Sequence, residues 1–529
     1  MRYVDQSLPF LKSDSRGRKK SVDTYFRKLN TTSWKGLLNQ EGTEYCGWRR
    51  SRGNMDNRET ELGVILVSGA SDWQIFQQDE TGMAALTLSG RYVLKPDQKM
   101  GKVVVQVRLV REDGYEAVTA SLDWQAATTR PDGTWSATLR DVPRGGLYRL
   151  ETCLTLDDGP IEWAIRGDMA HHLGVGDIWV ITGQSNAAGY GKTPVEDGPE
   201  LGIHAFTADG RWKLATHPLG DSTDTRYPPN RENANASHSP WMAFARRLKQ
   251  ALGYPVGLIP ASLGGSPVSA WDRQSDGVLF NNMLGYLADA GTGIKGAVWY
   301  QGESDTGENE RAVYKQRFAG FVEDLRREMR SPVLPVITVQ LNRYVGEDLD
   351  KPVHANWESM REIQRQLSHE LENVYLVSIF EAGLSDGIHN DSLGNLRIAQ
   401  RVAAAALGAV YGHPIAWRHP ECVAARHIAP DAVELEFRNI DGRLHYESRI
   451  GREFPFAVRD SQGEVPVAGY VLPEKDRFRI TLGRPLAGPA TVTGAPTANP
   501  PACVPFDIPG YRSMLGFTLA ITSETGGIA

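Results

Sequence analysis

The segment Ile178-Trp-Val-Ile-Thr-Gly-Gln-Ser-Asn186 joins an apolar, strand-like run to a short polar turn. Its first five residues form a continuous β-prone run, which is typical of a strand buried on both faces of a parallel sheet. Ser185 then stands at the turn from strand to helix, where free backbone N–H groups suit a nucleophile that develops negative charge. A serine here is equally typical of a helix N-cap, so this segment alone leaves both interpretations open.

Four further apolar runs follow the first one and alternate with segments of helical periodicity. The runs begin at Val256, Gly296, Val333 and Val374, and the helical segments span 241–252, 279–290, 311–329, 356–371 and 393–410. Alternating strands and helices predict a parallel sheet that is covered on both faces. We therefore expect a doubly wound α/β domain over residues 173–413, with about five parallel strands and with ligands bound at their carboxyl ends.

The chain changes character on either side of this domain. Residues 61–172 and 414–529 carry short β-prone runs separated by turn signals such as Pro131-Asp-Gly133. Many short strands without helical period predict a β-sandwich in each region, of jelly-roll or Ig-like type in the N-terminal one. Residues 1–60 are a polar and basic N-terminal segment. Residues 192–240 are dense in Pro, Asn, Ser and Asp, and we expect a long loop over the active edge of the sheet.

Three other polar segments follow predicted strands of the α/β domain. In Asp386-Gly-Ile-His389, the carboxylate can bind the imidazole Nδ1–H and leave Nε2 free to take a proton from a serine, although Asp-Gly is also a common surface turn. Gly264 and Gly265 permit backbone N–H groups to approach an oxyanion closely, and Gln301 offers a side-chain donor. Each of these segments, taken alone, is also explained by a loop or a helix cap.

Together these blocks resemble the SGNH-type serine esterases, in particular the branch of sialate O-acetylesterases and acetylxylan-esterase-like carbohydrate acetylesterases. The matching segments occur in the order of the family; they are Gly176–Asn186, Gly264–Trp271, Trp299–Asp305, and Asp386–His389 followed by Gly394. The resemblance implies a flavodoxin-like, three-layer α/β/α hydrolase domain flanked by β-sandwich domains. It also implies an enzyme that needs no cofactor and no metal.

The resemblance also implies a role for each matching position. Ser185 would be the nucleophile, His389 the general acid and base, and Asp386 the partner that orients His389. The amides of Ser185 and Gly265 would form the oxyanion hole together with the side chain of Gln301.

Six other positions are expected near the substrate or behind the reacting groups. Trp271 follows the glycine pair and is the candidate for a sugar-stacking platform, whereas Trp179 and Trp299 are expected in the core. Glu303 is expected to hold Gln301 or a loop amide. Arg361 is expected either at the rim of the pocket or on the surface. The full set is Gln184, Asn186, Gly264, Trp271, Glu303 and Arg361.

Composition argues against several classes of function. The 529 residues contain 58 Lys+Arg and 64 Asp+Glu, and a net charge of −6 gives no electrostatic reason to bind nucleic acid or an anionic membrane. No apolar run approaches the roughly 20 residues of a transmembrane helix. The four cysteines lack CxxC spacing, so neither a disulfide framework nor a zinc site is expected. No apolar signal segment follows Met1, and we expect a cytoplasmic protein. A secreted protein whose signal segment has been removed would show the same N-terminal sequence, so that alternative stays open.

The sequence thus predicts a carbohydrate O-acetylesterase that acts through a Ser-His-Asp acyl-enzyme mechanism. Its expected partner is an acetylated sugar or oligosaccharide of the xylo-, manno- or a similar plant-glycan type. One alternative is a sialic acid 9-O-acetylesterase, and an alternative of another class is a carbohydrate-binding protein without catalysis. The sequence does not fix the oligomeric state, so a homo-oligomer stays open.

Overall fold

The computed structural model describes residues 62–95, 101–232, 236–346, 349, 351–447, 454–508 and 510–523. All of them fall within one compact unit, Arg52–Ala529. The predicted N-terminal polar segment, residues 1–60, lies outside the described residues.

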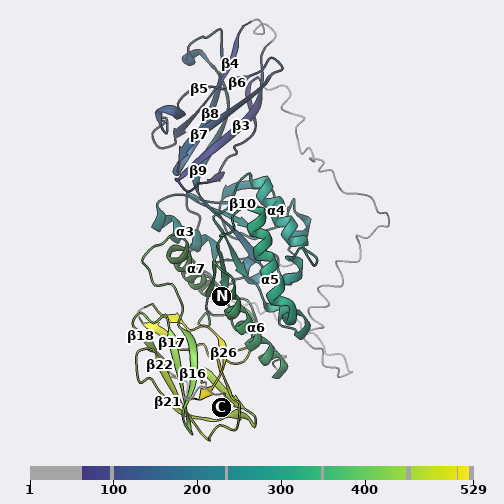
Figure 1. Cartoon of the computed structure of the whole chain (residues 1–529). Coiled ribbons are helices and arrows are strands. Elements are labelled where there is room, and N and C mark those ends of the chain that lie inside the picture. The colour runs from purple at the N-terminus through teal and green to yellow at the C-terminus, as the bar shows by residue number, and fades with distance from the viewer. Residues whose placement is uncertain are drawn as a thin grey trace, which may run out of the picture. The chain divides into compact units, whose positions relative to one another are not determined.

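A mixed sheet forms the centre of the α/β domain (Figure 1). Its strands run in the order β11-β10-β12-β9-β13-β14-β15. All neighbours from β10 to β15 pair in parallel, and β11 is antiparallel to β10. The strands are β9 (Ile165–Gly183), β10 (Ile203–Thr207), β11 (Arg211–Leu214), β12 (Val256–Pro260), β13 (Gly296–Tyr300), β14 (Val336–Val339) and β15 (Val374–Val377).

The strand β10 corrects two sequence expectations. It makes six parallel strands where about five were expected, and with β11 it lies inside residues 192–240, which were expected to be loop. The run from Ile203 to Thr207 is short and sits among polar residues, so its apolar character is easily overlooked. It is held by pairing with β12, which periodicity along one segment does not reveal.

Helices cover both faces of this sheet. Alternate residues of β9 point to opposite faces, and they pack into two different apolar cores. Ile178 and Val180 belong to one apolar cluster, whereas Trp179 and Ile181 belong to the other. The first cluster contains residues of α4, α5 and α6, and the second contains residues of α3 and α7. The helices are α2 (Ser185–Ala188), α3 (Trp241–Leu252), α4 (Val278–Ala290), α5 (Glu308–Glu328), α6 (Lys351–Glu370) and α7 (Ser392–Ala405), which continues as η7 (Ala406–Val410).

The N-terminal β region has two sheets around one core that includes Leu88 of β3 and Val107 of β4. One sheet has the order β1-β3-β7-β6; in the other, β8 joins β4 to β9. The strand β9 continues from this sheet into the α/β domain. The elements are β1 (Gly63–Ser68), β2 (Ile75–Gln77), β3 (Met83–Val93), β4 (Val103–Arg111), η2 (Ala120–Leu122), β5 (Gln125–Ala126), β6 (Thr128–Thr129), β7 (Thr134–Pro143), β8 (Gly145–Leu156) and η3 (Ile161–Trp163).

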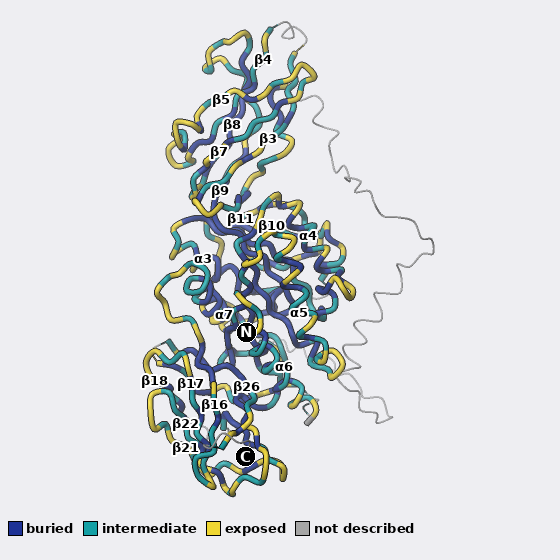
Figure 2. Tube along the Cα trace, in the orientation of Figure 1, coloured by how far each residue is buried: buried dark blue, intermediate teal, exposed yellow. Residues whose placement is uncertain are grey.

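The C-terminal β region has its own apolar core and three sheets, ordered β21-β22-β17-β16-β27, β20-β19-β23-β26 and β18-β24-β25. Figure 2 shows buried strands in this region and exposed residues at many of its turns. Its strands are β16 (Glu421–Ala429), β17 (Ala432–Arg438), β18 (Arg443–His445), β19 (Phe456–Asp460), β20 (Gly463–Val465), β21 (Val467–Val471), β22 (Arg477–Leu482), β23 (Thr491–Gly494), β24 (Phe506–Ile508), β25 (Arg512–Ser513), β26 (Phe517–Ala520) and β27 (Thr522–Ser523).

Among the described helices, none is both long enough and apolar enough to cross a lipid bilayer. Three further 3-10 turns lie in loops of the α/β domain, and they are η4 (Pro228–Asn230), η5 (Val268–Ala270) and η6 (Glu303–Asp305).

Candidate active site

Ser185 lies where the carboxyl end of the central strand β9 meets the short helix α2. The turn requires glycine at position 183, because its φ is +118° and a Cβ would collide with the carbonyl oxygen of Tyr300. The amide of Gln184 donates to the same carbonyl over 3.0 Å, which fixes the turn against β13. The strand and its neighbour therefore hold Ser185 at the edge where ligands bind in sheets of this kind.

The three residues of the predicted catalytic set are in direct contact. The Nε2 atom of His389 lies 2.9 Å from Ser185 Oγ, and its Nδ1 atom lies 2.8 Å from Asp386 Oδ2. Because the carboxylate accepts a hydrogen bond from the Nδ1–H group, Nε2 is left as the acceptor for the serine hydroxyl. The second oxygen of Asp386 accepts the amides of Ile388 and His389, over 3.0 and 2.9 Å.

These contacts keep the Asp386 carboxyl ionised. Desolvation by partial burial would raise its pKa, but the hydrogen bonds from the His389 side chain and from the two amides outweigh that effect and lower the pKa to about 2. The ammonium group of Lys192 lies 3.4 Å from Asp386 Oδ2 and adds a favourable charge. At neutral pH the group that orients His389 is therefore an anion.

Asn186 fastens the His389 segment to α2. Its Nδ2 atom donates to Glu303 Oε1 over 2.7 Å and to the carbonyl of Ile388 over 3.2 Å. Its Oδ1 atom accepts the backbone amide and the side-chain amide of Asn390, over 3.0 and 2.9 Å. Both neighbours of His389 in the sequence are thus bound to the residue that follows Ser185.

The carboxyl of Glu303 is buried against this network. The expectation that Glu303 holds Gln301 or a loop amide is wrong, since its side-chain partner is Asn186. Burial raises the pKa of Glu303, and its Oε2 atom has no hydrogen-bond partner among the described residues. Gln184 supports the same turn, because its Oε1 atom accepts the amide of Ser304 over 3.1 Å.

The glycine loop, residues 262–266, lies beside Ser185 because the amide of Leu263 donates to the carbonyl of Gly183 over 3.1 Å. The amide of Gly264 donates to Glu232 Oε2 over 2.7 Å and is therefore engaged within the protein. Gly265 has φ +67°, and a Cβ at that position would meet open space. Of the two glycines, Gly265 is therefore the one that borders free volume.

The side chain of Gln301 is not available as an oxyanion donor, which corrects the sequence expectation. Its Nε2 atom donates to the carbonyl of Ser266 over 3.2 Å and to Asp305 Oδ2. An amide nitrogen has two hydrogens, and both are used. Gln301 is fully buried and holds the glycine loop against η6.

The α/β domain that contains these residues is similar in sequence to known proteins. A family model described as "Carbohydrate esterase, sialic acid-specific acetylesterase" matches residues 175–408. A probable carbohydrate esterase of Arabidopsis thaliana is 29% identical over 44% of this chain and 90% of that protein. Residues 175–408 are thus similar to carbohydrate esterases over 44% of the chain.

More distant relatives agree with this esterase family and with the fold. Human sialate O-acetylesterase is 27% identical over 36% of this chain, and the match spans 42% of the human protein, less than half of its length. The structure of a carbohydrate acetylesterase from Xanthomonas citri is 21% identical and superposes with a TM-score of 0.60 over 86% of this chain and 99% of that one. The resemblance inferred from the four motifs is confirmed, and the last similarity extends the fold beyond the matched domain.

Trp271 is a core residue of the esterase domain and not a sugar platform, so that prediction is wrong. It is completely buried, its Nε1 atom donates to Ser266 Oγ over 3.2 Å, and its ring meets the edge of Trp299 with centroids 5.6 Å apart. The prediction that Trp179 and Trp299 are buried is confirmed.

Arg361 lies neither at a pocket rim nor on the surface. Its guanidinium is buried and donates to five carbonyl groups, two of them in the esterase domain and three in the C-terminal region. Burial lowers its pKa to about 9. The acceptors are the carbonyls of Leu341, Asn342, Ala495, Thr497 and Ala498. The residue therefore joins two parts of the chain.

Two residues at the site, Asn390 and Tyr190, belong to no sequence motif and were not predicted. Asn390 donates to Asn186 Oδ1 as described, and its own Oδ1 atom accepts a hydrogen bond from Asn342 Nδ2 over 2.6 Å. Tyr190 stacks on the imidazole of His389, and its hydroxyl is hydrogen-bonded to Glu232. Tyr190 lies five residues after Ser185 in the sequence, which is the one signal that could have indicated it. Asn390 has no such signal.

Within the described residues, one cluster has side chains of the types that bind metal ions. It consists of Asp197, His217 and His238. Both histidine Nε2 atoms contact Asp197 Oδ2, over 2.9 and 3.1 Å. The Nδ1 atom of His217 faces the amide of Ser239, and that of His238 faces Asn395 Nδ2, each over 3.4 Å. Nitrogen atoms that face donors are unprotonated, so the protons lie on Nε2 and point at Asp197. This arrangement fits a hydrogen-bonded cluster and does not fit metal ligation through Nε2.

Proposed function

We propose that this chain is a serine O-acetylesterase that removes acetyl groups from acetylated sugars or oligosaccharides. The observation that carries the proposal is the continuous set of hydrogen bonds from Ser185 Oγ through His389 to the Asp386 carboxylate. A nucleophile, a base with a free Nε2 and an ionised orienting group are what acyl transfer through serine requires.

The reaction proceeds in two halves. Ser185 Oγ attacks the acetyl carbonyl carbon while His389 Nε2 takes the hydroxyl proton, and the tetrahedral intermediate carries the negative charge on the former carbonyl oxygen. When it collapses, the bond to the sugar oxygen breaks, that oxygen receives the proton from Nε2, and acetyl-Ser185 remains. Water then attacks the acetyl group with His389 as base, and acetate leaves as Ser185 recovers its proton. Asp386 stabilises the imidazolium in both halves.

The amides of Ser185 and Gly265 form the oxyanion hole in this proposal. The open space at Gly265 supports it, whereas the amide of Gly264 is already bound by Glu232. Loss of one oxyanion donor typically costs about 10²–10³-fold in kcat. Gln301 has no part in stabilising the oxyanion and instead positions the glycine loop.

The proposed substrates are small acetylated xylo- or manno-oligosaccharides or similar plant-glycan fragments, in keeping with the predicted cytoplasmic location. A sialic acid 9-O-acetylesterase is the second candidate, and the sialic acid-specific description of the matching family favours keeping it. The contacts of Ser185 and His389 argue against a carbohydrate-binding protein without catalysis.

The test is acetate release from p-nitrophenyl acetate by the wild type and by Ser185→Ala. We expect the variant to lose more than about 10³-fold in kcat, because the nucleophile is absent. Ser275→Ala, at an exposed serine of the same domain, is the matched control and should keep wild-type activity. Near wild-type turnover by Ser185→Ala would reject the proposal. Loss of acetyl groups from acetylated oligosaccharides and sialic acids, followed by mass, then identifies the substrate.

A further inference from the structure

A relay of three buried amide side chains, Asn342, Asn390 and Asn186, connects the segment after β14 with the reacting groups. Each of the three residues is at most 3% exposed. Asn342 Nδ2 donates to Asn390 Oδ1 over 2.6 Å, and Asn390 Nδ2 donates to Asn186 Oδ1 over 2.9 Å. Asn390 is the residue after His389, and Asn186 is the residue after Ser185. The relay therefore ends beside both the proposed base and the proposed nucleophile.

Backbone groups fix the direction of every hydrogen bond in this relay. Asn186 Nδ2 donates to the carbonyl of Ile388 over 3.2 Å, and because a carbonyl can only accept, the Oδ1 atom of Asn186 is its acceptor end. That atom accepts the backbone amide and Nδ2 of Asn390, over 3.0 and 2.9 Å. The Oδ1 atom of Asn390 is then left to face Asn342, which must donate. A side chain without a donor at position 342 would remove the donor that the structure gives this buried oxygen.

Helix α6 holds the backbone of Asn342 in place. Arg361 of α6 donates from Nε to the carbonyl of Leu341 over 3.0 Å and from Nη2 to the carbonyl of Asn342 over 2.7 Å. In the same segment, the amide of Val345 donates to the carbonyl of Gly387 over 2.7 Å. The segment from 341 to 345 is thus fixed to a helix and also bound to the loop that carries the proposed base. A side chain that starts from a fixed backbone can hold its partner in one position.

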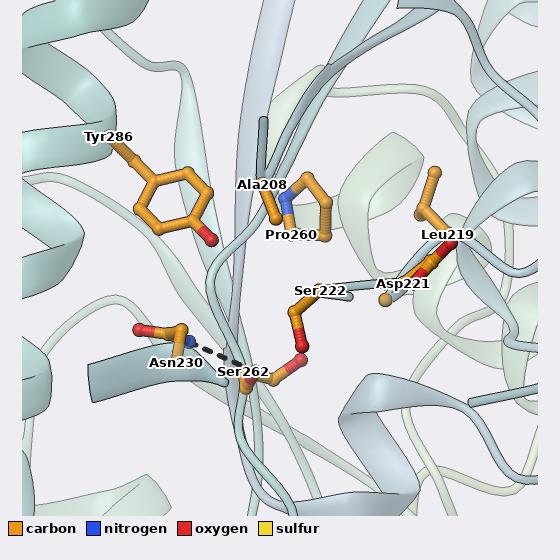
Figure 3. Close-up of a pocket in the computed structure, with 9 residues that line it drawn as sticks. Ala208, Leu219, Asp221, Ser222, Asn230, Pro260, Ser262 and Tyr286 are labelled. Carbon is orange, nitrogen blue, oxygen red and sulfur yellow. Dashed lines mark hydrogen bonds between the residues drawn. The ribbon is translucent and has the colours of Figure 1, made fainter. Parts of the chain in front are cut away.

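The glycine loop, residues 262–266, has a separate support. Figure 3 shows Asn230 beside the start of this loop, where its Nδ2 atom donates to the carbonyl of Ser262 over 3.1 Å. The same atom donates to the carbonyl of Ala261 over 2.5 Å. The described hydrogen bonds of the relay do not include this loop. A change at Asn342 should therefore disturb the proposed base and leave the backbone donors of the oxyanion hole in place.

We propose that Asn342 is a positioning residue for His389. Through Asn390 it fixes the place of the imidazole between Asp386 and Ser185, which contact Nδ1 and Nε2 over 2.8 and 2.9 Å. The proposal rests on the proposed O-acetylesterase activity and deepens it, because a base that moves the proton must be held in place. Misplacing a reacting group by about 1 Å can cost about 10²-fold in rate.

The experiment compares two acetate esters that differ in their leaving group, p-nitrophenyl acetate and glyceryl triacetate. Both need His389 Nε2 as the base that takes the proton of Ser185. The p-nitrophenolate ion leaves without a proton, whereas the glycerol alkoxide must receive one from Nε2. Displacement of His389 should therefore harm glyceryl triacetate more. A residue with a structural role alone changes the amount of active enzyme, which lowers the turnover of both esters by the same factor.

Asn342→Ala removes the donor to Asn390. We expect kcat on glyceryl triacetate to fall about tenfold with KM nearly unchanged, and kcat on p-nitrophenyl acetate to fall at most about threefold. Gln340→Ala is the matched control, because Gln340 is buried in the same segment but binds the carbonyl of Arg361 and the backbone of Gly516. It should leave the ratio of the two kcat/KM values as in wild type. Asn342→Ser shortens the side chain by one bond, so its hydroxyl falls short of Asn390, and it should show the same preference as Asn342→Ala.

The outcomes separate this role from the activity itself. If wild type releases no acetate from glyceryl triacetate, the proposed function fails. If it does so but Asn342→Ala lowers both esters by the same factor, as a loss of folded enzyme would, the positioning role is rejected and the activity stands. A tenfold rise in KM at unchanged kcat would overturn the role as well. If Asn342→Ala does not yield folded protein, the ratio measured with Asn342→Ser decides by the same criterion.

Discussion

The ring of Tyr190 lies against the imidazole of His389, with ring centroids 4.8 Å apart and planes inclined by 20°. The Tyr190 hydroxyl is hydrogen-bonded to Glu232, whose carboxylate accepts the amide of Gly264. One chain of contacts therefore runs from the proposed base to the glycine loop. An aromatic face favours an imidazolium beside it and restricts the tilt of the ring, so Tyr190 has the position of a residue that orients His389.

Replacing this aromatic ring should slow the reaction. For Tyr190→Leu we expect a loss of about tenfold in kcat, because an aromatic pair contributes about 0.5–1.5 kcal/mol beyond its burial and 1.4 kcal/mol corresponds to a factor of ten. Tyr190→Phe is the matched variant, which keeps the stacked ring and loses only the bond to Glu232. It should retain most of the activity. The measurement is kcat and KM on p-nitrophenyl acetate; equal kcat for wild type and Tyr190→Leu would contradict the role.

Arg361 should matter for stability, since no carboxylate accompanies its buried charge among its described hydrogen-bond partners, which are five carbonyl oxygens. Arg361→Met keeps much of the volume but removes a donor from each acceptor. The carbonyl of Ala498 keeps the amide of Tyr344, and each buried group that is left unsatisfied costs about 1–3 kcal/mol. We expect the free energy of unfolding to fall by at least about 3 kcal/mol, measured by urea denaturation. Arg397→Met, at an exposed position of α7, is the control and should change little. Equal midpoints for the two variants would contradict this account.

The contrast between the predicted and the unpredicted residues has a physical basis. Ser185, Asp386 and His389 could be identified from the sequence because each sits in a short motif at a strand end, where the backbone turn itself sets the direction of the side chain. The alternating runs likewise predicted the parallel sheet, because burial on both faces dictates a continuous apolar pattern.

Side chains whose partners are distant in the sequence could not be placed in this way. Arg361 finds three of its acceptors more than 130 residues away, in the C-terminal region. Gln301 was expected to face a ligand, but the carbonyl of Ser266 competes for the same amide hydrogens. A sequence motif gives the type of donor available, whereas the neighbouring loop decides where that donor points.

Trp271 offers a direct test of a core role against a substrate role. Trp271→Phe removes the hydrogen bond to Ser266 Oγ and leaves a cavity beside Trp299. Because the ring is fully buried, we expect a loss of stability of about 1–3 kcal/mol with little change in KM for an acetylated oligosaccharide. Thermal unfolding and KM are measured on the same preparations. A large rise in KM without loss of stability would restore the sugar-stacking role.

Asp305 should make stability fall as the pH rises through the mildly acidic range. Burial raises its pKa to about 6, compared with about 3.9 in an unfolded chain. Between pH 4 and pH 6 the folded protein therefore binds more protons than the unfolded one, so the contribution of this group to the free energy of unfolding decreases with rising pH, by up to about 3 kcal/mol.

Asp305→Asn removes the titration and keeps one oxygen for the amide of Val268 and the side chain of Gln301, which both donate to Oδ2. It also places an amino group where Oδ1 has no partner among the described residues. We expect the variant to lose this slope, since the cost of the unpaired amide group is the same at both pH values, as measured by denaturant unfolding at pH 4.5 and 7.0. The exposed Asp276→Asn should keep the wild-type slope; an unchanged slope in Asp305→Asn would show that this carboxyl is ionised in the folded protein throughout the range.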